Sequence, residues 1–295
     1  MTKQAGAFIV VYGPSKAGKT TACGAAAAAG LFIAQAGALT PVRRFLGVDK
    51  INERRAKTVQ DAVAILESEG KKHPVICVDD FSVLVAQTVR DLEAKYSFGD
   101  MWQRLRTQVL GMRDIARELT ESGIHVIFNA HERPQRTSSG RYIRGGPELP
   151  GQLPELFSAF ADVVARAVYD ETAAPWKYVF HTGPNGQWIS GDRLSVFPDE
   201  SPMNLAEGLR EAGFPCPRPK GLQWQEKVVE AGAEAVLSAG LEDWRTPLRE
   251  IVDKINGAKP AAHIRWALQD ALHRAILRSA QQDLVEDFFA GEDEW

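Results

Sequence analysis

A glycine-rich segment near the amino end constrains the fold more than any other feature. Residues 13–20 (GPSKAGKT) fit the pattern G-x-x-x-x-G-K-[ST]. They follow an apolar run at residues 7–12 and precede an Ala-rich run at residues 20–29 that ends at Gly30. The first run is typical of a strand buried on both faces, and the second of a helix. This context predicts a phosphate-binding loop, because glycines let backbone amides surround an anion at a helix N-terminus.

The motif assigns roles to individual side chains. Lys19 reaches the β and γ phosphates, the Thr20 hydroxyl ligates Mg²⁺, and Thr21 is expected near the α-phosphate. Lys16 either contacts phosphate or is solvated. The expected cofactor-binding residues are Gly13, Pro14, Ser15, Lys16, Ala17, Gly18, Lys19, Thr20 and Thr21.

Strand and helix patterns alternate along the following part of the chain. Apolar residues recur at helical spacing from Val59 to Leu66 and again over residues 101–119. Short apolar runs predict strands at residues 31–34, 75–78, 124–130, 163–169 and 176–181. This order predicts right-handed crossovers and an α/β fold with a mainly parallel sheet flanked by helices.

The length of 295 residues favours about two domains. Prolines cluster between residues 198 and 219, β-branched runs disappear there, and the pattern from Leu222 onward is helical. We therefore expect a core at residues 1–200 and a helical region with an acidic tail at residues 201–295.

Polar side chains follow two of the predicted strands. Asp79 ends the run VICVD, where a carboxylate suits Mg²⁺ or its water, although an acidic turn is the alternative. Asp80 either polarises the attacking water or caps the next segment. After the strand at residues 124–130, His131 and Asn129 are candidates for sensing a γ-phosphate, and Glu132 is a weaker candidate for a general base. A structural role is the alternative for His131.

The segment that follows is basic. It contains Arg133, Arg136, Arg141, Tyr142 and Arg144, and its only acid up to residue 152 is Glu148. Arginines for phosphates with an aromatic ring for base stacking suit single-stranded nucleic acid. A solvated flexible loop is the alternative.

Two further features bear on assembly. Lys177 and Arg193, on a predicted hairpin, are candidates to complete the phosphate site of a neighbouring subunit, with ordinary surface charge as the alternative. The segment 283–295 holds six acids, no base and the aromatic residues Phe288, Phe289 and Trp295. Such tails often dock on basic grooves, although a frayed terminus is the alternative.

Composition excludes several classes. A net charge of −3 excludes an all-over basic coat for nucleic acid. Three scattered cysteines make no disulfide framework and no zinc motif. No apolar run approaches the roughly 18 residues of a membrane span, and the start lacks the pattern of a secretory signal. We therefore expect a soluble, cytoplasmic protein with no membrane partner.

Taken together, the sequence resembles the RecA-type P-loop ATPases of the phage AAA-domain nucleotide-binding family, the RecA-core-only single-strand annealing proteins. The resemblance rests on FIVVYGPSKAGKTT, VICVDDFS, VIFNAHERPQR with GGPELPGQLPELFSAFADVV, and WISGDR, and it covers roughly residues 7–197. It implies a RecA-like core, ATP and Mg²⁺ at residues 13–20 and Asp79, a γ-phosphate sensor at His131, and single-stranded DNA at the following loop. It also implies that Arg193 acts across an interface in a homo-oligomer, and that a single-strand binding protein is a partner.

The expected function is therefore ATP-dependent binding and annealing of single-stranded DNA in phage-type recombination. Lys19, Asp79, Asp80, His131 and Arg193 are its expected catalytic residues. One departure is the absence of an acid after the strand at residues 31–34, where Gln35 stands. It favours the alternative of a nucleotide-gated adaptor with weak ATPase activity that recruits a replication or packaging partner. A third hypothesis is a small-molecule kinase, in which the Arg-rich loop is a lid.

Overall fold

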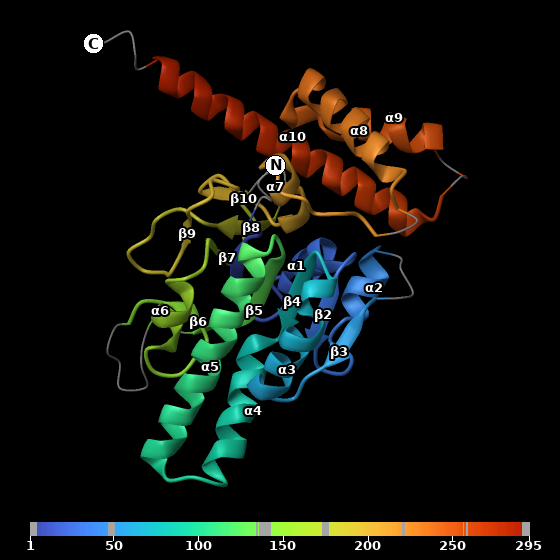
Figure 1. Cartoon of the computed structure of the whole chain (residues 1–295). Coiled ribbons are helices and arrows are strands. Elements are labelled where there is room, and N and C mark those ends of the chain that lie inside the picture. Colours follow the sequence, from blue (N-terminus) through green and yellow to red (C-terminus); the bar gives the residue numbers. More distant parts are fainter. Residues whose placement is uncertain are drawn as a thin grey trace.

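The computed structural model describes residues 5–46, 51–133, 135, 143–172, 177–219, 222–255, 257 and 259–290, without the side chains of 45, 46 and 284–290. A central sheet has the strand order β10-β8-β7-β1-β5-β4-β2-β3 (Figure 1). These strands are β1 (Phe8–Gly13), β2 (Leu31–Ala34), β3 (Glu53–Arg55), β4 (Val75–Asp79), β5 (His125–Arg133), β7 (Val163–Tyr169), β8 (Tyr178–His181) and β10 (Glu200–Pro202). The short strands β6 (Gly146–Pro147) and β9 (Gly191–Asp192) pair with β5 and β7.

The six strands from β7 to β3 are parallel. Beyond β7 the sheet continues with β8, antiparallel to β7, and with β10, antiparallel to β8. The predicted mainly parallel α/β sheet is confirmed. Strand β5 lies between β1, which leads into residues 13–20, and β4, which ends at Asp79. This arrangement is that of a RecA-like core, and it brings the ends of three strands together at one edge of the sheet.

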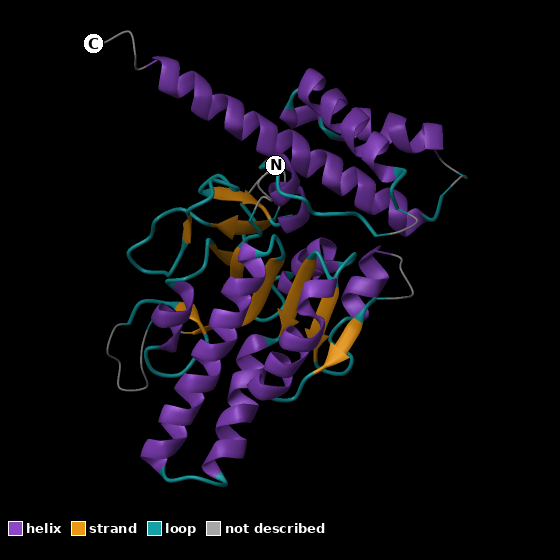
Figure 2. Ribbon diagram, in the orientation of Figure 1, coloured by secondary structure: helices purple, strands orange, loops and turns teal. Residues whose placement is uncertain are grey.

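Helices cover both faces of the sheet (Figure 2). One face packs against α3 (Val59–Glu69), α4 (Phe81–Glu93), α5 (Phe98–Glu121) and α6 (Leu153–Ser158). The other packs against α1 (Lys19–Ala27), α2 (Thr40–Leu46) and α7 (Leu205–Glu211). Consecutive residues of β1 alternate between the two cores, so the whole strand is buried as expected.

Local sequence signals explain several helix starts. Thr58 and Asp61 form a capping box at α3, in which each side chain bonds the other residue's backbone amide. Asp80 caps α4 by accepting a hydrogen bond from the Ser82 amide. Strand β3 and helices α2 and α6 are not predicted from the sequence, because they are short. Helix α4 is also absent from the sequence predictions, although Phe81, Leu84, Val85 and Leu92 lie at helical spacing.

The helical expectation for the carboxyl-terminal region is confirmed. Helices α8 (Gln225–Ala239), α9 (Arg245–Ile255) and α10 (Ala261–Ala290) pack around their own apolar cluster (Figure 1). The chain reaches them through β10, which pairs with β8 in the main sheet, and through α7, which packs on α1. The boundary near residue 200 therefore stays a prediction.

A buried ionic network joins α10 to α7 and α8. The guanidiniums of Arg218 and Arg274 lie between the carboxylates of Glu207, Asp270 and Glu226 at 2.5–2.9 Å. Although burial opposes ionisation of Glu226, hydrogen bonds from both arginines lower its pKa to about 2. This network holds the carboxyl-terminal helices against the core.

No described helix is long and apolar enough to cross a bilayer.

Candidate nucleotide-binding site

The phosphate-binding loop joins β1 to α1 as the motif predicts. Lys16 and Gly18 have positive φ angles of 65° and 84°, which turn the backbone into a compact loop. Five amides in or just after this loop donate no hydrogen bond within the described part of the chain: those of Ser15, Lys16, Gly18, Lys19 and Thr20. Unpaired amides at a helix N-terminus suit an anion, so the loop fits a phosphate chain.

Gly13 is required by close packing at the base of this loop. A Cβ atom there would lie 2.1 Å from the carbonyl oxygen of Ala167 on β7. Any side chain would therefore force β1 and β7 apart.

The Lys19 side chain is held along the loop. Its ammonium donates hydrogen bonds to the carbonyl oxygens of Gly13, at 2.9 Å, and of Pro14, at 2.8 Å. Burial lowers the pKa of Lys19, while the nearby carboxylates of Asp80 and Asp79 oppose that shift. These carbonyls fix the position of a buried cation beside the free amides.

Thr20, Asp79 and Asn129 form a polar cluster at the ends of β4 and β5. The Thr20 hydroxyl donates to the Asp79 carboxylate at 3.4 Å, and the Asn129 amide donates to both residues. Burial, with the adjacent Asp80 carboxylate, raises the pKa of Asp79 to about 6. The Asn129 side-chain oxygen is buried without a partner among the described residues.

These donors fit Mg²⁺. The ion prefers hard oxygen ligands and usually takes only one or two from the protein, with phosphate and water completing the shell. A buried, poorly neutralised carboxylate beside a hydroxyl provides such a pair, and a cation there would offset the burial of Asp79.

Asp80 and His131 form the next layer. His131 Nε2 lies 2.7 Å from Asp80 Oδ2, and the His131 backbone amide donates to the Ser82 hydroxyl at 2.9 Å. Burial raises the pKa of Asp80, and His131 opposes the shift. Asp80 therefore caps α4, which is one of the two roles that the sequence left open, and it also contacts His131. Its role toward an attacking water stays a prediction.

Glu132 is engaged by a neighbour on β7. Arg166 donates to its carboxylate at 2.7 Å and also lies over the Trp188 ring, 3.5 Å from the ring centre. Nothing in the sequence singled out Arg166. Its contact with Glu132 follows from the strand order, because β1 separates β7 from β5 and the ends of all three strands meet at the same edge of the sheet.

A cavity of about 320 Å³ adjoins the loop on the side of α1. Its lining includes Gly18 and Thr21 from the loop and α1, Tyr178 and Met203 from the antiparallel edge, and Trp266 from α10. A Cβ on Gly18 would lie 3.3 Å from the Tyr178 ring. The carboxyl-terminal helix thus forms one wall beside the phosphate loop, which sequence reasoning missed because these residues are far apart in the chain.

Of the five residues predicted to contact DNA, Arg136, Arg141 and Tyr142 lie outside the described residues. The other two support the ends of that segment. The Arg133 guanidinium binds the carbonyl of Arg144 and the Glu155 carboxylate, both at 2.7 Å. The Arg144 guanidinium binds the carbonyls of Trp188 and Asn185 at 2.8 and 2.6 Å. Both guanidiniums therefore make structural contacts.

Arg193 lies far from the loop of its own chain. Its guanidinium binds the Ala161 carbonyl at 2.6 Å, just before β7 begins, whereas the phosphate loop follows the opposite end of the neighbouring β1. Its side chain is 58% exposed. Contact with a phosphate site therefore requires a second subunit. Lys177 is exposed beside the cavity-lining Tyr178.

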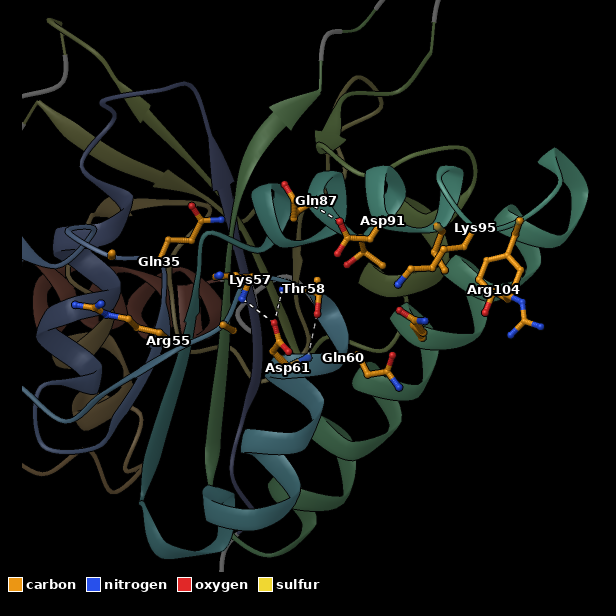
Figure 3. A pocket seen from close by; sticks show the side chains of 16 residues that line it. Gln35, Arg55, Lys57, Thr58, Gln60, Asp61, Gln87, Asp91, Lys95 and Arg104 are labelled. Atoms are coloured by element: carbon orange, nitrogen blue, oxygen red, sulfur yellow. Dashed lines mark hydrogen bonds between the residues drawn. The ribbon is translucent and has the colours of Figure 1, made fainter.

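Gln35 contributes to a separate cleft. This cleft of about 1120 Å³ lies between the ends of β2 and β3 and helices α3, α4 and α5 (Figure 3). Its acids Asp61 and Asp91 accept hydrogen bonds from the backbone at Lys57 and Thr58 and from Gln87, respectively. None of the residues that line it belongs to the phosphate loop.

The fold and the loop together define a P-loop ATPase. A family model described as an AAA domain matches residues 5–194, and the chain belongs to this family. The structure is similar to flagellar accessory protein FlaH from Methanocaldococcus jannaschii, at 12% identity and a TM-score of 0.43, over 66% of this chain and 84% of that one. It is also similar to KaiC-like protein PH0186 from Pyrococcus horikoshii OT3, at 17% identity and a TM-score of 0.38, over 60% and 77%. A search of curated protein sequences found no significant match.

Proposed function

We propose that this AAA-domain protein hydrolyses ATP with Mg²⁺ and uses the nucleotide to control binding and annealing of single-stranded DNA. The observation that carries the proposal is the run of contacts at the end of β5. Asn129 bonds the Thr20–Asp79 pair, His131 contacts Asp80, and Arg133 holds the base of the Arg-rich segment. One strand therefore leads from the phosphate loop to the proposed DNA segment.

The residues divide the chemistry as follows. Free loop amides and Lys19 bind the phosphates and stabilise charge on the γ-phosphate as the bond breaks. Thr20 and Asp79 hold Mg²⁺, which neutralises phosphate charge when bound. His131, fixed by Asp80 and the Ser82 hydroxyl, responds to the γ-phosphate. Loss of that phosphate releases the end of β5 and with it the DNA segment.

Assembly belongs to the same proposal. Arg193 is exposed and remote from its own phosphate loop, so it serves the site of a neighbouring subunit in a homo-oligomer. A cation supplied in this way stabilises transition-state charge. A single-strand binding protein that presents the DNA is the proposed partner.

The test is a titration of labelled single-stranded DNA with and without a non-hydrolysable ATP analogue, at several salt concentrations. We expect tighter binding with the analogue and a steep loss of affinity with salt. Tyr142→Ala and Arg141→Ala should weaken binding, whereas Arg106→Ala, an exposed arginine on α5, should not. If DNA binding by the Lys19→Ala variant still depends on the nucleotide, the proposed coupling between nucleotide and DNA binding is contradicted.

A second candidate is a nucleotide-gated adaptor with weak hydrolysis. It is favoured by Gln35, an amide at the end of β2 that cannot act as a general base. The two candidates separate in a steady-state ATPase assay. DNA stimulates the rate in the first and leaves it unchanged in the second.

A further inference from the structure

An open groove lies between α9, α10 and the antiparallel edge of the sheet. Its volume is about 620 Å³, which is within the range of pockets that bury a sizeable ligand. Its apolar lining includes Leu248, Leu272 and Met203, each at least nine-tenths buried. This groove is separate from the phosphate loop, although Tyr178 lines both it and the adjoining cavity.

The rim of the groove is cationic. Four basic side chains line it, and no acid does: Lys177, Arg245, Arg249 and Arg265. All four are exposed, and none forms an ion pair with any residue that the structure describes. Arg245 lies over the Trp244 ring, 4.5 Å from its centre, so an aromatic surface is present at the rim as well.

The groove also holds an unpartnered polar group. His273 is 5% exposed, and its Nδ1 atom has no hydrogen-bond partner among the described residues. Unpaired cations around an apolar floor fit an occupant that is both acidic and aromatic.

The chain itself carries a segment of that chemistry. Residues 283–295 (DLVEDFFAGEDEW) hold six carboxylates, no base and three large aromatic residues. We propose that this segment of one copy docks in the cation-rimmed groove of a second copy, with an aromatic side chain on the apolar floor and its acids on the rim.

Docking within one copy is excluded by distance. His273 is the last residue of α10 that lines the groove, and α10 continues to Ala290. At about 1.5 Å per residue, the helix carries the chain about 26 Å farther away. The last five residues span at most about 18 Å when fully extended. Figure 1 shows α10 as one long helix whose end projects away from α8 and α9. The occupant therefore comes from another copy.

The test uses a labelled peptide of residues 283–295 and the full-length protein. We expect saturable binding, measured by fluorescence anisotropy, that weakens as salt rises. Arg249→Glu with Arg265→Glu should weaken it tenfold or more, whereas the matched control Arg106→Glu, on α5, should not. Unchanged binding to the groove variant would overturn the proposal.

Self-association gives a second readout. Sedimentation of the full chain should show weaker association for Trp295→Ala and for the groove variant. Exchanging the charges between groove and segment should restore association. The exchanged protein combines the groove variant with Glu292→Lys, Asp293→Lys and Glu294→Lys. Failure of the exchange to restore association would contradict the proposal. Binding of single-stranded DNA that requires Arg249 and Arg265, without saturable binding of the peptide, would also contradict it, since the groove would then bind nucleic acid and not the acidic segment.

Discussion

The Thr20 hydroxyl donates a hydrogen bond to the Asp79 carboxylate across 3.4 Å, joining the start of α1 to the end of β4. We propose that this pair provides the oxygen ligands for Mg²⁺. We expect Asp79→Asn, which keeps the shape and removes the charge, to abolish most of the Mg²⁺-dependent gain in ATP affinity. Binding measured in EDTA should change little.

The measurement is a titration with a fluorescent ATP analogue in Mg²⁺ and in EDTA. A loss of tenfold corresponds to about 1.4 kcal/mol. Asp91→Asn is the matched control, because Asp91 lies on α4 and bonds only Gln87 in the described contacts. If Mg²⁺ still tightens binding to Asp79→Asn as much as to the unaltered protein, Asp79 is not the ligand.

Gly13→Ala tests the packing of the sheet beneath the phosphate loop. The added Cβ would lie 2.1 Å from the Ala167 carbonyl oxygen, so β1 and β7 must separate. Overpacking in a core typically costs about 1–3 kcal/mol, and a chain of about 300 residues that unfolds as one unit loses roughly 1.5–2 °C in Tm for each kcal/mol. Gly186→Ala, with nothing within 4 Å of the new atom, should leave Tm nearly unchanged. Equal Tm values for both variants in thermal unfolding would show that the strands adapt freely.

The sequence predicts the phosphate loop and the sheet well because their signals are local. We recognise the phosphate loop from consecutive residues: a run of six apolar residues, a glycine loop and an Ala-rich helix. The strand order then brings Asp79 and Asn129 together. The wall formed by Tyr178 and Trp266 could not be predicted, because it depends on how α10 packs more than 240 residues after the loop. Arg133 and Arg144 show a second limit. Composition marks them as basic, but only the fold shows that their guanidiniums bind backbone carbonyls.

We expect the buried His273 to make the folded protein less stable in acid. Burial lowers its pKa from 6.5 to about 4. As pH falls from about 6.5 to 4, the unfolded chain takes up a proton on this residue and the folded protein does not. The folded state therefore loses stability over that window, by at most about 1.4 kcal/mol per pH unit.

Urea unfolding at pH 7 and pH 5 measures this loss. His273→Phe should reduce the difference in unfolding free energy between the two pH values by about 2 kcal/mol. The same difference in both proteins would mean that His273 is protonated while the protein is folded.

We expect the stability of the carboxyl-terminal region to depend strongly on one buried cation, the guanidinium of Arg218. Its side chain is 4% exposed and binds Glu207 and Asp270, whose side chains are fully buried. Arg218→Met leaves Asp270 with a hydrogen bond from the Asn204 amide and with the Arg210 guanidinium at 4.0 Å. Removing one partner from a buried ionic group typically costs about 3–5 kcal/mol, because the remaining charge is desolvated without compensation.

Arg278→Met is the matched control, since Arg278 pairs with Glu211 and Glu230 at the less buried edge of the same network. That change should cost at most about 1 kcal/mol. The double variant Arg218→Met with Asp270→Leu should recover part of the stability, because it removes the stranded carboxylate as well. Urea unfolding monitored by tryptophan fluorescence measures all three. A double variant less stable than Arg218→Met alone would show that the loss comes from packing and not from an unpaired charge.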